Sequence, residues 1–244
     1  MSPFQPYETI GHVPGAAGAN ILIVADHASN HVPAGISLGI APGQLENHIA
    51  IDIGVASVTR ALCASLRCGA VLAGVSRLVI DFNREEDAPG LIPTISDGVA
   101  IPGNVGADAQ ARLAAFYRPY HAAVTRAIDT LEHPFLLSLH SFTPRLATRP
   151  EERRPWDVGI LYNTDDRAAR IAIPMLHDAG LLVGDQLPYA GTALNATMNL
   201  HAEARGIAYL GVEMRQDRVA SASGVHRMAA VLGPVLLACS NRLA

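Results

Sequence analysis

Two short apolar segments of the chain each end in a histidine. Residues 21–25 are followed by Asp26 and His27, and residues 135–139 are followed by His140. Apolar runs of this length are typical of buried strands in an α/β sheet, which binds its ligands at the carboxyl ends of the strands. A single histidine at such a place more often caps the strand by bonding to a nearby backbone group. Because the pattern occurs twice, and imidazole is a common metal ligand, it predicts a metal site at this edge.

A third ligand is needed to complete such a site. Zinc hydrolases hold the metal with three His, Asp or Glu side chains and leave one position for a water molecule, whose pKa falls toward neutrality. Asp52 is favoured because an ionised carboxylate offsets part of the metal charge, although a helix-capping role fits its position almost as well. Asn30 is a poorer ligand and is expected to orient a ligand or the substrate instead. The other candidates are Asp26, His31 and His48.

A carboxylate follows a further apolar run. Residues 208–212 end in Glu213, which should bring this side chain to the same edge of the sheet. A carboxylate at a half-buried strand end can have its pKa raised toward the working pH, which suits a general base. The alternative is a buried ion pair with Arg215 or another arginine.

Two arginines bracket a short strand-like segment, residues 78–81. The planar guanidinium group matches a carboxylate with two parallel hydrogen bonds, so Arg84, at the carboxyl end, is expected to hold an acidic substrate. Arg77 has two interpretations. It polarises a carbonyl group if the chain bends after Ser76, and otherwise it is a salt-bridge partner on the far side of the domain.

The remaining elements follow from hydrophobic periodicity and short apolar runs. Helices are expected over residues 51–66, 108–131, 166–179 and 224–239, with the second kinked or split at Pro119, and strands over residues 21–25, 70–75, 78–81, 135–139, 158–162 and 207–213. Strands that alternate with helices predict an α/β fold, a three-layer sandwich with a mainly parallel, mixed central sheet. The length fits one large domain as well as two small ones, and we expect one domain over residues 1–244.

Two long connections are candidate substrate-binding loops or lids. They cover residues 82–107 and 143–157, and connections of this length are uncommon inside a compact domain. Arg145 of the second loop is therefore a candidate substrate-binding residue, although a solvated surface loop explains its arginines equally simply. We also expect His201 and residues 191–195 to line the pocket. There the imidazole would bond to the tetrahedral intermediate, unless it is a structural histidine.

Composition limits the classes of partner. The chain has 244 residues with 50% hydrophobic residues, 16% charged residues and a net charge of −4. It has no basic run long enough to follow a phosphate backbone, so no nucleic-acid partner is expected. We find no stretch of about 20 apolar residues for a membrane span and no secretion signal in the first eight residues, which predicts a cytoplasmic protein without a membrane partner. The three cysteines are expected to be reduced and structural.

Several motifs, kept in order along nearly the whole chain, resemble the N-formylglutamate amidohydrolase family. They are DHASN at 26–30, HIAIDIG at 48–54, SR at 76–77, NR at 83–84, PGN at 102–104, SLHSFTP at 138–144, LPY at 187–189 and VEMR at 212–215. The resemblance implies a zinc-dependent amidohydrolase that cleaves the N-formyl, or a similarly small N-acyl, amide of an acidic amino acid. Its reaction would convert N-formylglutamate and water to glutamate and formate.

The family is in turn similar to the zinc carboxypeptidases, which implies a zinc-carboxypeptidase-like fold and a role for individual residues. In that mapping His27 and His140 are metal ligands, Asn83 and Arg84 bind the substrate, and Glu213 is the base. One position departs from the carboxypeptidase pattern, because Asn30 stands where that pattern has a glutamate ligand. Either Asp52 supplies the missing carboxylate, which is our choice, or the chain binds metal weakly.

The leading hypothesis is therefore a Zn²⁺ enzyme with a small acidic N-acyl amino acid as its substrate. Arg84 would hold the α-carboxylate, and Arg77, Asn83 and Arg145 would contact the carbonyl group or the side-chain carboxylate. One alternative is a related zinc hydrolase that acts on other N-acyl amino acids or short peptides, which would need a larger pocket. A second alternative, left open by Asn30, is a metal-free binding protein on the same fold.

Overall fold

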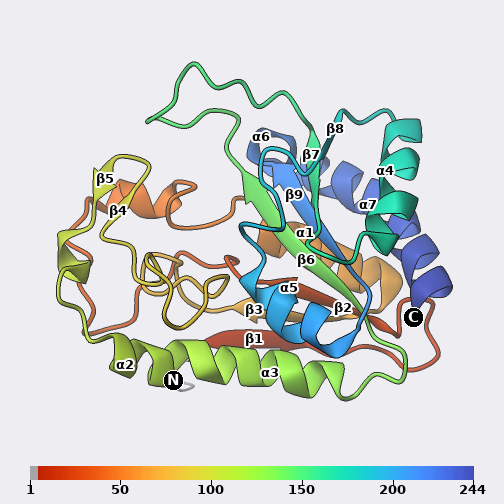
Figure 1. The fold of residues 1–244 in the computed structure, drawn as a ribbon, viewed down its shortest axis with the longest axis horizontal. Coiled ribbons are helices and arrows are strands. Elements are labelled where there is room, and N and C mark those ends of the chain that lie inside the picture. The colour runs from red at the N-terminus through yellow and green to blue at the C-terminus, as the bar shows by residue number, and fades with distance from the viewer. Residues whose placement is uncertain (1–4) are drawn as a thin grey trace.

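A seven-stranded mixed sheet forms the centre of the fold in the computed structural model, which describes residues 5–244 (Figure 1). Residues 1–4, part of the N-terminal segment considered above, lie outside the described residues. In sheet order the strands are β1 (Tyr7–Ile10), β3 (Gly69–Ala73), β2 (Ile21–Ala25), β6 (Phe135–Phe142), β9 (Tyr209–Arg215), β7 (Val158–Leu161) and β8 (Val183–Asp185). The neighbours β3, β2, β6 and β9 are parallel, whereas β1, β7 and β8 run in the opposite direction.

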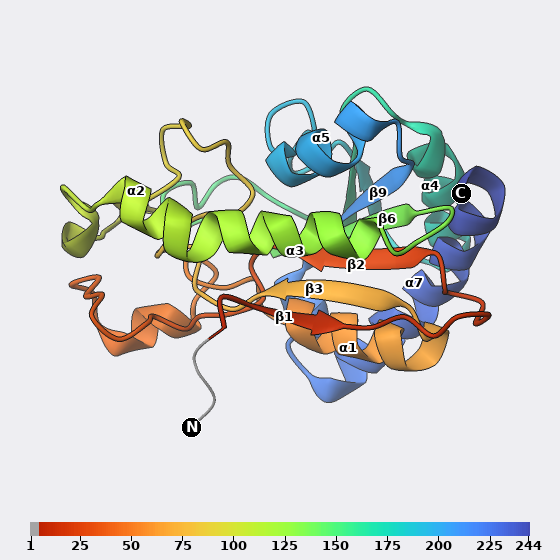
Figure 2. The same cartoon turned by 90° about the horizontal axis from the view of Figure 1, so that it is seen from below.

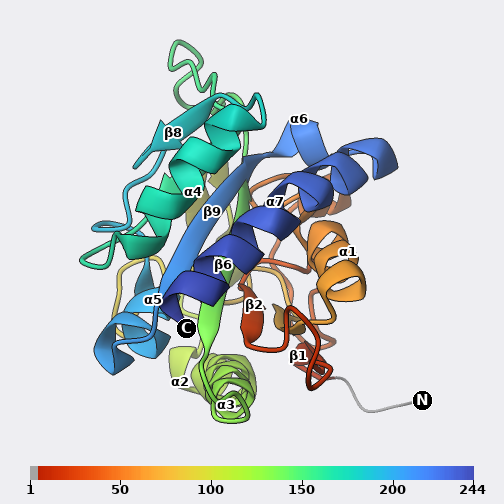
Figure 3. The ribbon, with the colours of Figure 1, turned by 90° about the vertical axis from the view of Figure 1, so that its right-hand side faces the viewer.

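Helices cover both faces of this sheet. Helices α1 (Val55–Leu66), α4 (Arg167–Asp178) and α7 (Ala222–Leu243) lie side by side over one face (Figure 3). Helix α3 (Arg118–Ile128) runs along the other face, next to α5 (Ala196–His201) (Figure 2). The expected α/β sandwich with a mainly parallel, mixed sheet is confirmed.

Each face of the sheet has its own apolar core, and strand β6 contributes to both. Leu137 packs in the core that includes Leu62 and Leu232, and its neighbour Leu136 packs in the core that includes Val124. Side chains alternate between the faces of a strand, so a strand covered on both sides is apolar at nearly every position. This explains why the central strands read as uninterrupted apolar runs.

The predicted strand over residues 78–81 is wrong, because this segment forms a turn. The Ser76 hydroxyl donates to the carbonyl of Ala50 and accepts the N–H of Leu78, and the carbonyl of Ser76 accepts the N–H of Val79. A serine side chain that bonds to nearby backbone groups competes with strand pairing. The segment is apolar because it is buried, with Ile80 fully enclosed.

The helix predicted over residues 108–131 runs from Ala109 to Ile128, and it is not split at Pro119. It consists of α2 (Ala109–Arg112), a π-helical turn (Leu113–Tyr117) and α3. Pro119 lies just after the π-helical turn, within the first turn of α3, so the wider turn accommodates its missing N–H group. The remaining short elements are the strands β4 (Ile95–Ser96) and β5 (Val99–Ala100), helix α6 (Gln216–Val219) and the 3₁₀ turns Pro42–Glu46, Pro102–Asn104 and Glu203–Arg205.

Helix α7 departs from the sequence expectation, because among the described residues it is the one helix long and apolar enough to cross a membrane. Half of its most apolar stretch is buried, and Leu232 and Leu236 are fully enclosed in the core against the sheet. Packing in a protein core therefore accounts for its composition. The three cysteines are buried free thiols.

The carboxyl ends of β2 and β3 point to the side of the molecule where the long connections gather, at the left of Figure 2. Residues 82–107, 143–157 and the segment between β8 and α5 surround this edge. The fold thus places the strand-end histidines under a rim of loops.

Candidate active site

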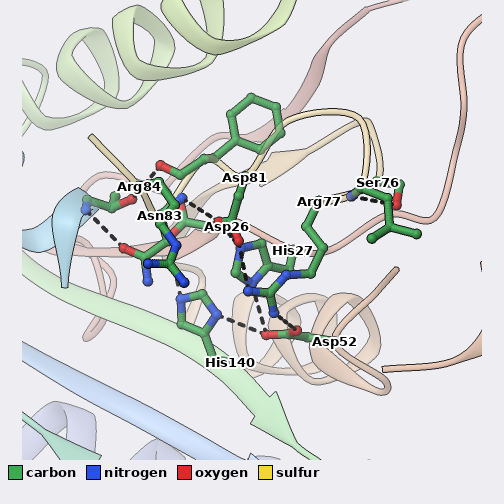
Figure 4. Close-up of polar contacts among 12 residues, drawn as sticks. Asp26, His27, Asp52, Ser76, Arg77, Asp81, Asn83, Arg84 and His140 are labelled. Atoms are coloured by element: carbon green, nitrogen blue, oxygen red, sulfur yellow. Dashed lines mark hydrogen bonds and ion pairs between the residues drawn. The ribbon is translucent and has the colours of Figure 1, made fainter. Parts of the chain in front are cut away.

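Three buried side chains meet at this edge of the sheet. Nδ1 of His140 lies 2.9 Å from Oδ2 of Asp52, and Nδ1 of His27 lies 3.3 Å from the same oxygen. One ligand atom of each residue lies within 4.8 Å of the others, and Figure 4 shows the Asp52 carboxylate as the common partner. Two imidazoles and a carboxylate are a ligand set that zinc accepts. The structure therefore brings together the three residues predicted as metal ligands.

A tight turn before α1 carries Asp52. The N–H of Asp52 donates to the carbonyl of His27 at 3.0 Å, and the N–H of Ser141 donates to the Asp52 carboxylate at 3.2 Å. The turn ends at Gly54, which has a φ of 84° and packs so closely on Val219 that a side chain would collide with it. Gly54 occupies the N-cap position of α1, so Asp52 points to the histidines and does not cap the helix.

The second nitrogen of each imidazole faces a further carboxylate. Nε2 of His27 lies 2.7 Å from Asp81, and Nε2 of His140 lies 3.3 Å from Asp26, which also accepts the hydroxyl of Tyr120 at 2.7 Å. Carboxylates in these positions fix the tautomer and orientation of metal-binding histidines. Both Nδ1 atoms are left facing the shared site, so the residues present fit a zinc ion. Asp26 is not one of the three side chains whose ligand atoms meet at the site.

Opposite charges control ionisation in this cluster. Burial alone would raise the pKa of Asp52, but the charge of His27, the hydrogen bond from His140 and the charge of Arg77 hold it well below its usual value. Burial alone would lower the pKa of His140, but Asp26 and Asp52 raise it well above the usual range. The cluster is an environment that attracts positive charge.

Arg77 reaches the cluster because the chain bends after Ser76. Its guanidinium group donates to Asp52 at 3.3 Å and to Asp81 at 2.8 Å, and 30% of the side chain is exposed (Figure 4). Of the two placements considered from the sequence, the structure shows the one beside the site. Asp81 is a residue that sequence reasoning missed, although it lies in the segment between the two arginines.

Glu213 lies beside the cluster on strand β9, directly opposite His140 in the register of β6 and β9. Burial and the nearby Asp52 charge raise its pKa to about 7, although His140 and Arg77 act in the opposite direction. Its Oε2 atom is buried and has no hydrogen-bond partner in the described part of the chain. Arg215 pairs with Asp217 instead, so the alternative ion pair with Glu213 does not form.

A cavity of about 220 Å³ opens onto these residues. Asn83 and Arg84 form part of its wall, and the amide oxygen of Asn83 accepts the N–H of Thr197 at 3.0 Å. Within residues 5–244, the guanidinium group of Arg84 has neither an ion-pair nor a hydrogen-bond partner. An unpaired cation in a cavity wall is suited to bind an anionic group.

Other predicted residues lie outside this cavity. Asn30 donates to Glu46 near the surface, and Arg145 is exposed on its loop. His201 is buried but turns toward α3, where its Nε2 atom lies 2.9 Å from Nδ1 of His121. Burial and His121 lower the pKa of His201 to about 4. The expectation that His201 lines the pocket is therefore corrected, because packing of α5 on α3 decides which way it faces.

The two remaining candidates for the third ligand, His31 and His48, lie in different surroundings. His31 is exposed, whereas His48 lines the cavity wall and bonds to Asp97 through Nε2 at 3.1 Å. Tyr189 also lines the cavity, and sequence analysis assigned it no role, although it belongs to the LPY motif at 187–189.

Together, the mixed α/β sheet, the buried His-Asp-His cluster and the adjoining carboxylate define a hydrolase-type α/β domain with a candidate metal centre. The family model described as N-formylglutamate amidohydrolase matches residues 19–220. The chain belongs to the N-formylglutamate amidohydrolase family, which confirms the resemblance seen in the sequence and makes it an amidohydrolase.

Solved structures agree with this fold. The chain is similar to the gene product Atu2144 from Agrobacterium tumefaciens, with 29% identity, a TM-score of 0.90, and coverage of 98% of this chain and 96% of that chain. It is also similar to an N-formylglutamate amidohydrolase from Ralstonia eutropha JMP134, with 18% identity, a TM-score of 0.75, and coverage of 98% of both chains. At 18% identity this second likeness shows the fold alone. No curated protein matches the sequence.

Proposed function

We propose that this amidohydrolase depends on zinc and cleaves the N-formyl, or a similarly small N-acyl, amide of an acidic amino acid. Its reaction converts N-formylglutamate and water to glutamate and formate. One observation carries the proposal. One small cavity holds the cluster of His27, Asp52 and His140, the buried carboxyl group of Glu213, and the guanidinium group of Arg84, which has no partner among the described residues. Membership of the family supports the type of bond that is cleaved.

The cluster would hold the zinc ion through Nδ1 of His27, Nδ1 of His140 and the carboxylate of Asp52. A zinc ion at this position supplies Lewis acidity, which activates water and polarises a carbonyl oxygen. The protein orients the two imidazole rings. Asp81 and Asp26 face the Nε2 atoms of the two histidines, so each imidazole can present a Nδ1 lone pair to the metal.

Glu213 moves the proton. It takes a proton from the attacking water and later delivers it to the nitrogen of the leaving amine. A pKa of about 7 suits both steps, because the group can be charged before the attack and protonated before the amine leaves. Its unpartnered Oε2 atom supports this role, since no described residue competes for the proton.

Substrate binding is assigned to the wall of the cavity. Arg84 and the amide nitrogen of Asn83 hold the α-carboxylate, and the partly exposed Arg77 contacts the carbonyl oxygen. The proposal gives no contact with substrate to Asn30, Arg145 or His201, which lie outside the cavity.

A hydrolysis screen with metal analysis tests this function. The purified protein is expected to retain about one zinc ion per chain and to hydrolyse N-formylglutamate faster than N-acetylglutamate or N-succinylglutamate. A small cavity favours short acyl groups over the peptides of the alternative hypothesis. Preference for peptides or large acyl groups would favour a related zinc hydrolase. Absence of zinc, with no activity after zinc is added, would favour the metal-free binding protein and refute the proposal.

A further inference from the structure

Three hydrogen-bond donors in the cavity wall have no acceptor within residues 5–244. These groups are the guanidinium group of Arg84, the amide nitrogen of Asn83 and the hydroxyl of Tyr189. Arg84 and Asn83 are adjacent in sequence and together suit one carboxylate. Tyr189 enters the same cavity wall from a different part of the fold, the segment between β8 and α5.

Most of the other polar side chains of the cavity wall already have partners. The hydroxyls of Ser141 and Thr143 each donate to a backbone carbonyl. Arg77 donates to two carboxylates, and its remaining N–H groups are assigned to the carbonyl oxygen in the proposed function. His48 bonds to Asp97, and burial lowers the pKa of His48, so its ring is neutral at neutral pH. With Arg77 assigned to the carbonyl oxygen, Tyr189 is the donor that is left for a second anionic group of the substrate.

Tyr189 is held in place by a buried arginine. Nη1 of Arg154 donates to the hydroxyl oxygen of Tyr189 at 2.7 Å, and the guanidinium carbon lies 5.0 Å from the ring centroid. Only 3% of the Arg154 side chain is exposed, and Glu152 is its ion-pair partner at 3.0 Å. Because the oxygen already accepts from a cation, the hydroxyl hydrogen points elsewhere and becomes a stronger donor. Burial raises the pKa of Tyr189, so this hydrogen stays in place at neutral pH.

Two glycines allow the segment that carries Tyr189 to lie against the sheet. Side chains at Gly159 of β7 or Gly184 of β8 would collide with the carbonyl oxygen of Leu187. Because these two residues have no side chains, the segment can fold back over the sheet and bring Tyr189 to the cavity. The position of Tyr189 therefore depends on glycines in β7 and β8 as well as on the loop itself.

We propose that Tyr189 is a specificity-determining residue, which donates a hydrogen bond to the second carboxylate of the substrate while Arg84 and Asn83 bind the first. Arg154 is a positioning residue that acts through Tyr189. The inference rests on the proposed function, and it deepens that function by assigning the residue that recognises the second carboxylate of the substrate.

The kinetic test compares N-formylglutamate with N-formylglutamine, which lacks the second carboxylate. Tyr189→Phe is expected to lower kcat/KM for N-formylglutamate about tenfold to a hundredfold, and to change it for N-formylglutamine by less than about twofold. The matched control is Tyr162→Phe, because Tyr162 bonds to Asp185 away from the cavity and its loss should change neither value. An equal loss for both substrates, or no loss for either, would overturn the inference.

The positioning role of Arg154 has its own measurement. Arg154→Gln is expected to lower kcat/KM for N-formylglutamate but not for N-formylglutamine. The double variant with Tyr189→Phe should fall no further than Tyr189→Phe alone, because both changes remove the same interaction. Additive losses would show that Arg154 acts independently of Tyr189 and would overturn this part of the inference.

Direct binding separates this inference from the proposed function. Titration calorimetry on the zinc-loaded protein compares glutarate, which has two carboxylates, with butyrate, which has one. The wild type should bind glutarate more tightly than butyrate. Tyr189→Phe should weaken the binding of glutarate about tenfold and leave the binding of butyrate unchanged. If the wild type hydrolyses neither formyl amide, the proposed function fails, and glutarate binding still decides the role of Tyr189. Unchanged glutarate binding by Tyr189→Phe would overturn it.

Discussion

Nδ1 of His140 lies 2.9 Å from Oδ2 of Asp52, although 88 residues separate the two in the sequence. The zinc-carboxypeptidase pattern takes its carboxylate ligand from the third position after the first histidine, where this chain has Asn30. Asn30 instead bonds to Glu46 near the surface. The carboxylate beside the two imidazoles thus comes from the turn before α1, where backbone bonds to His27 and Ser141 hold it.

Asp52→Asn is expected to weaken zinc binding more than about a hundredfold, because it removes a charged ligand and leaves a neutral amide between two imidazoles. Zinc content after dialysis, measured by elemental analysis, checks this. Asp129→Asn is the matched control, since Asp129 is exposed and pairs with Arg205 on the surface. Full zinc retention by Asp52→Asn would remove Asp52 from the ligand set.

Asp81→Asn should weaken zinc binding about tenfold to a hundredfold, which is less than loss of a ligand. The reason is that Asp81 orients His27 at 2.7 Å without contacting the metal position itself. Competition with a chelator of known affinity measures the effect. Saturating zinc should restore most of the activity, and a variant that stays inactive at full zinc occupancy would contradict an orienting role.

Glu213→Gln should lower kcat about a hundredfold to ten-thousandfold and leave zinc content unchanged, because glutamine keeps the shape but cannot carry the proton. Stopped assays measure kcat, and metal analysis of the same preparation measures the zinc content. Wild-type turnover in this variant would show that another group moves the proton.

Arg84→Met should raise KM for N-formylglutamate more than about tenfold with a smaller change in kcat, because the free guanidinium group binds the substrate and does not take part in bond cleavage. Arg145→Met is the internal control. Arg145 is exposed and does not line the cavity, so its removal should leave KM unchanged. A raised KM in Arg145→Met would show that the 143–157 loop reaches the substrate after all.

Asp97 joins the loops at the rim of the cavity and should make stability depend on pH. It accepts the N–H groups of Ala147 and Thr148 and the Thr148 hydroxyl, and it faces His48. Burial alone would raise the pKa of Asp97, but the bonds from Thr148 and Ala147 lower it from 3.8 to about 2. A lowered pKa gives stability that is present above about pH 4 and lost as the pH falls toward 2.

Asp97→Asn should therefore lower the free energy of unfolding by about 1–3 kcal/mol at pH 6. The difference from the wild type should shrink between pH 4 and pH 2. Urea unfolding at several pH values measures this, and a difference that stays constant with pH would contradict the assignment.

The sequence was sufficient for those parts of the site that follow from strand ends. His27, His140 and Glu213 end apolar runs, and parallel strands bring their carboxyl ends to one edge, so their meeting is a property of the sheet. Asp52 was predicted from charge balance together with its position at the start of a predicted helix.

Residues whose placement depends on tertiary packing could not be predicted. Asp81 lies in a segment whose apolar residues resemble a strand. Hydrogen bonds of the Ser76 hydroxyl hold this segment in a turn, and no sequence pattern indicates them. His201 faces His121, which is 80 residues away, and no local pattern indicates which side of a short helix packs on α3. Tyr189 lies in irregular backbone, where no periodicity exists to place it.

His140 and Glu213 are paired in the ladder between β6 and β9, which holds them apart from the loops that line the cavity. Backbone hydrogen bonds set the spacing of these two residues, so the spacing does not depend on neighbouring side chains. Arg84 and Tyr189, in contrast, stand on connections between elements, which tolerate substitution and changes in length. The sheet thus sets the distance between His140 and Glu213, so a change in the loops that carry Arg84 and Tyr189 can alter substrate recognition without moving these two residues.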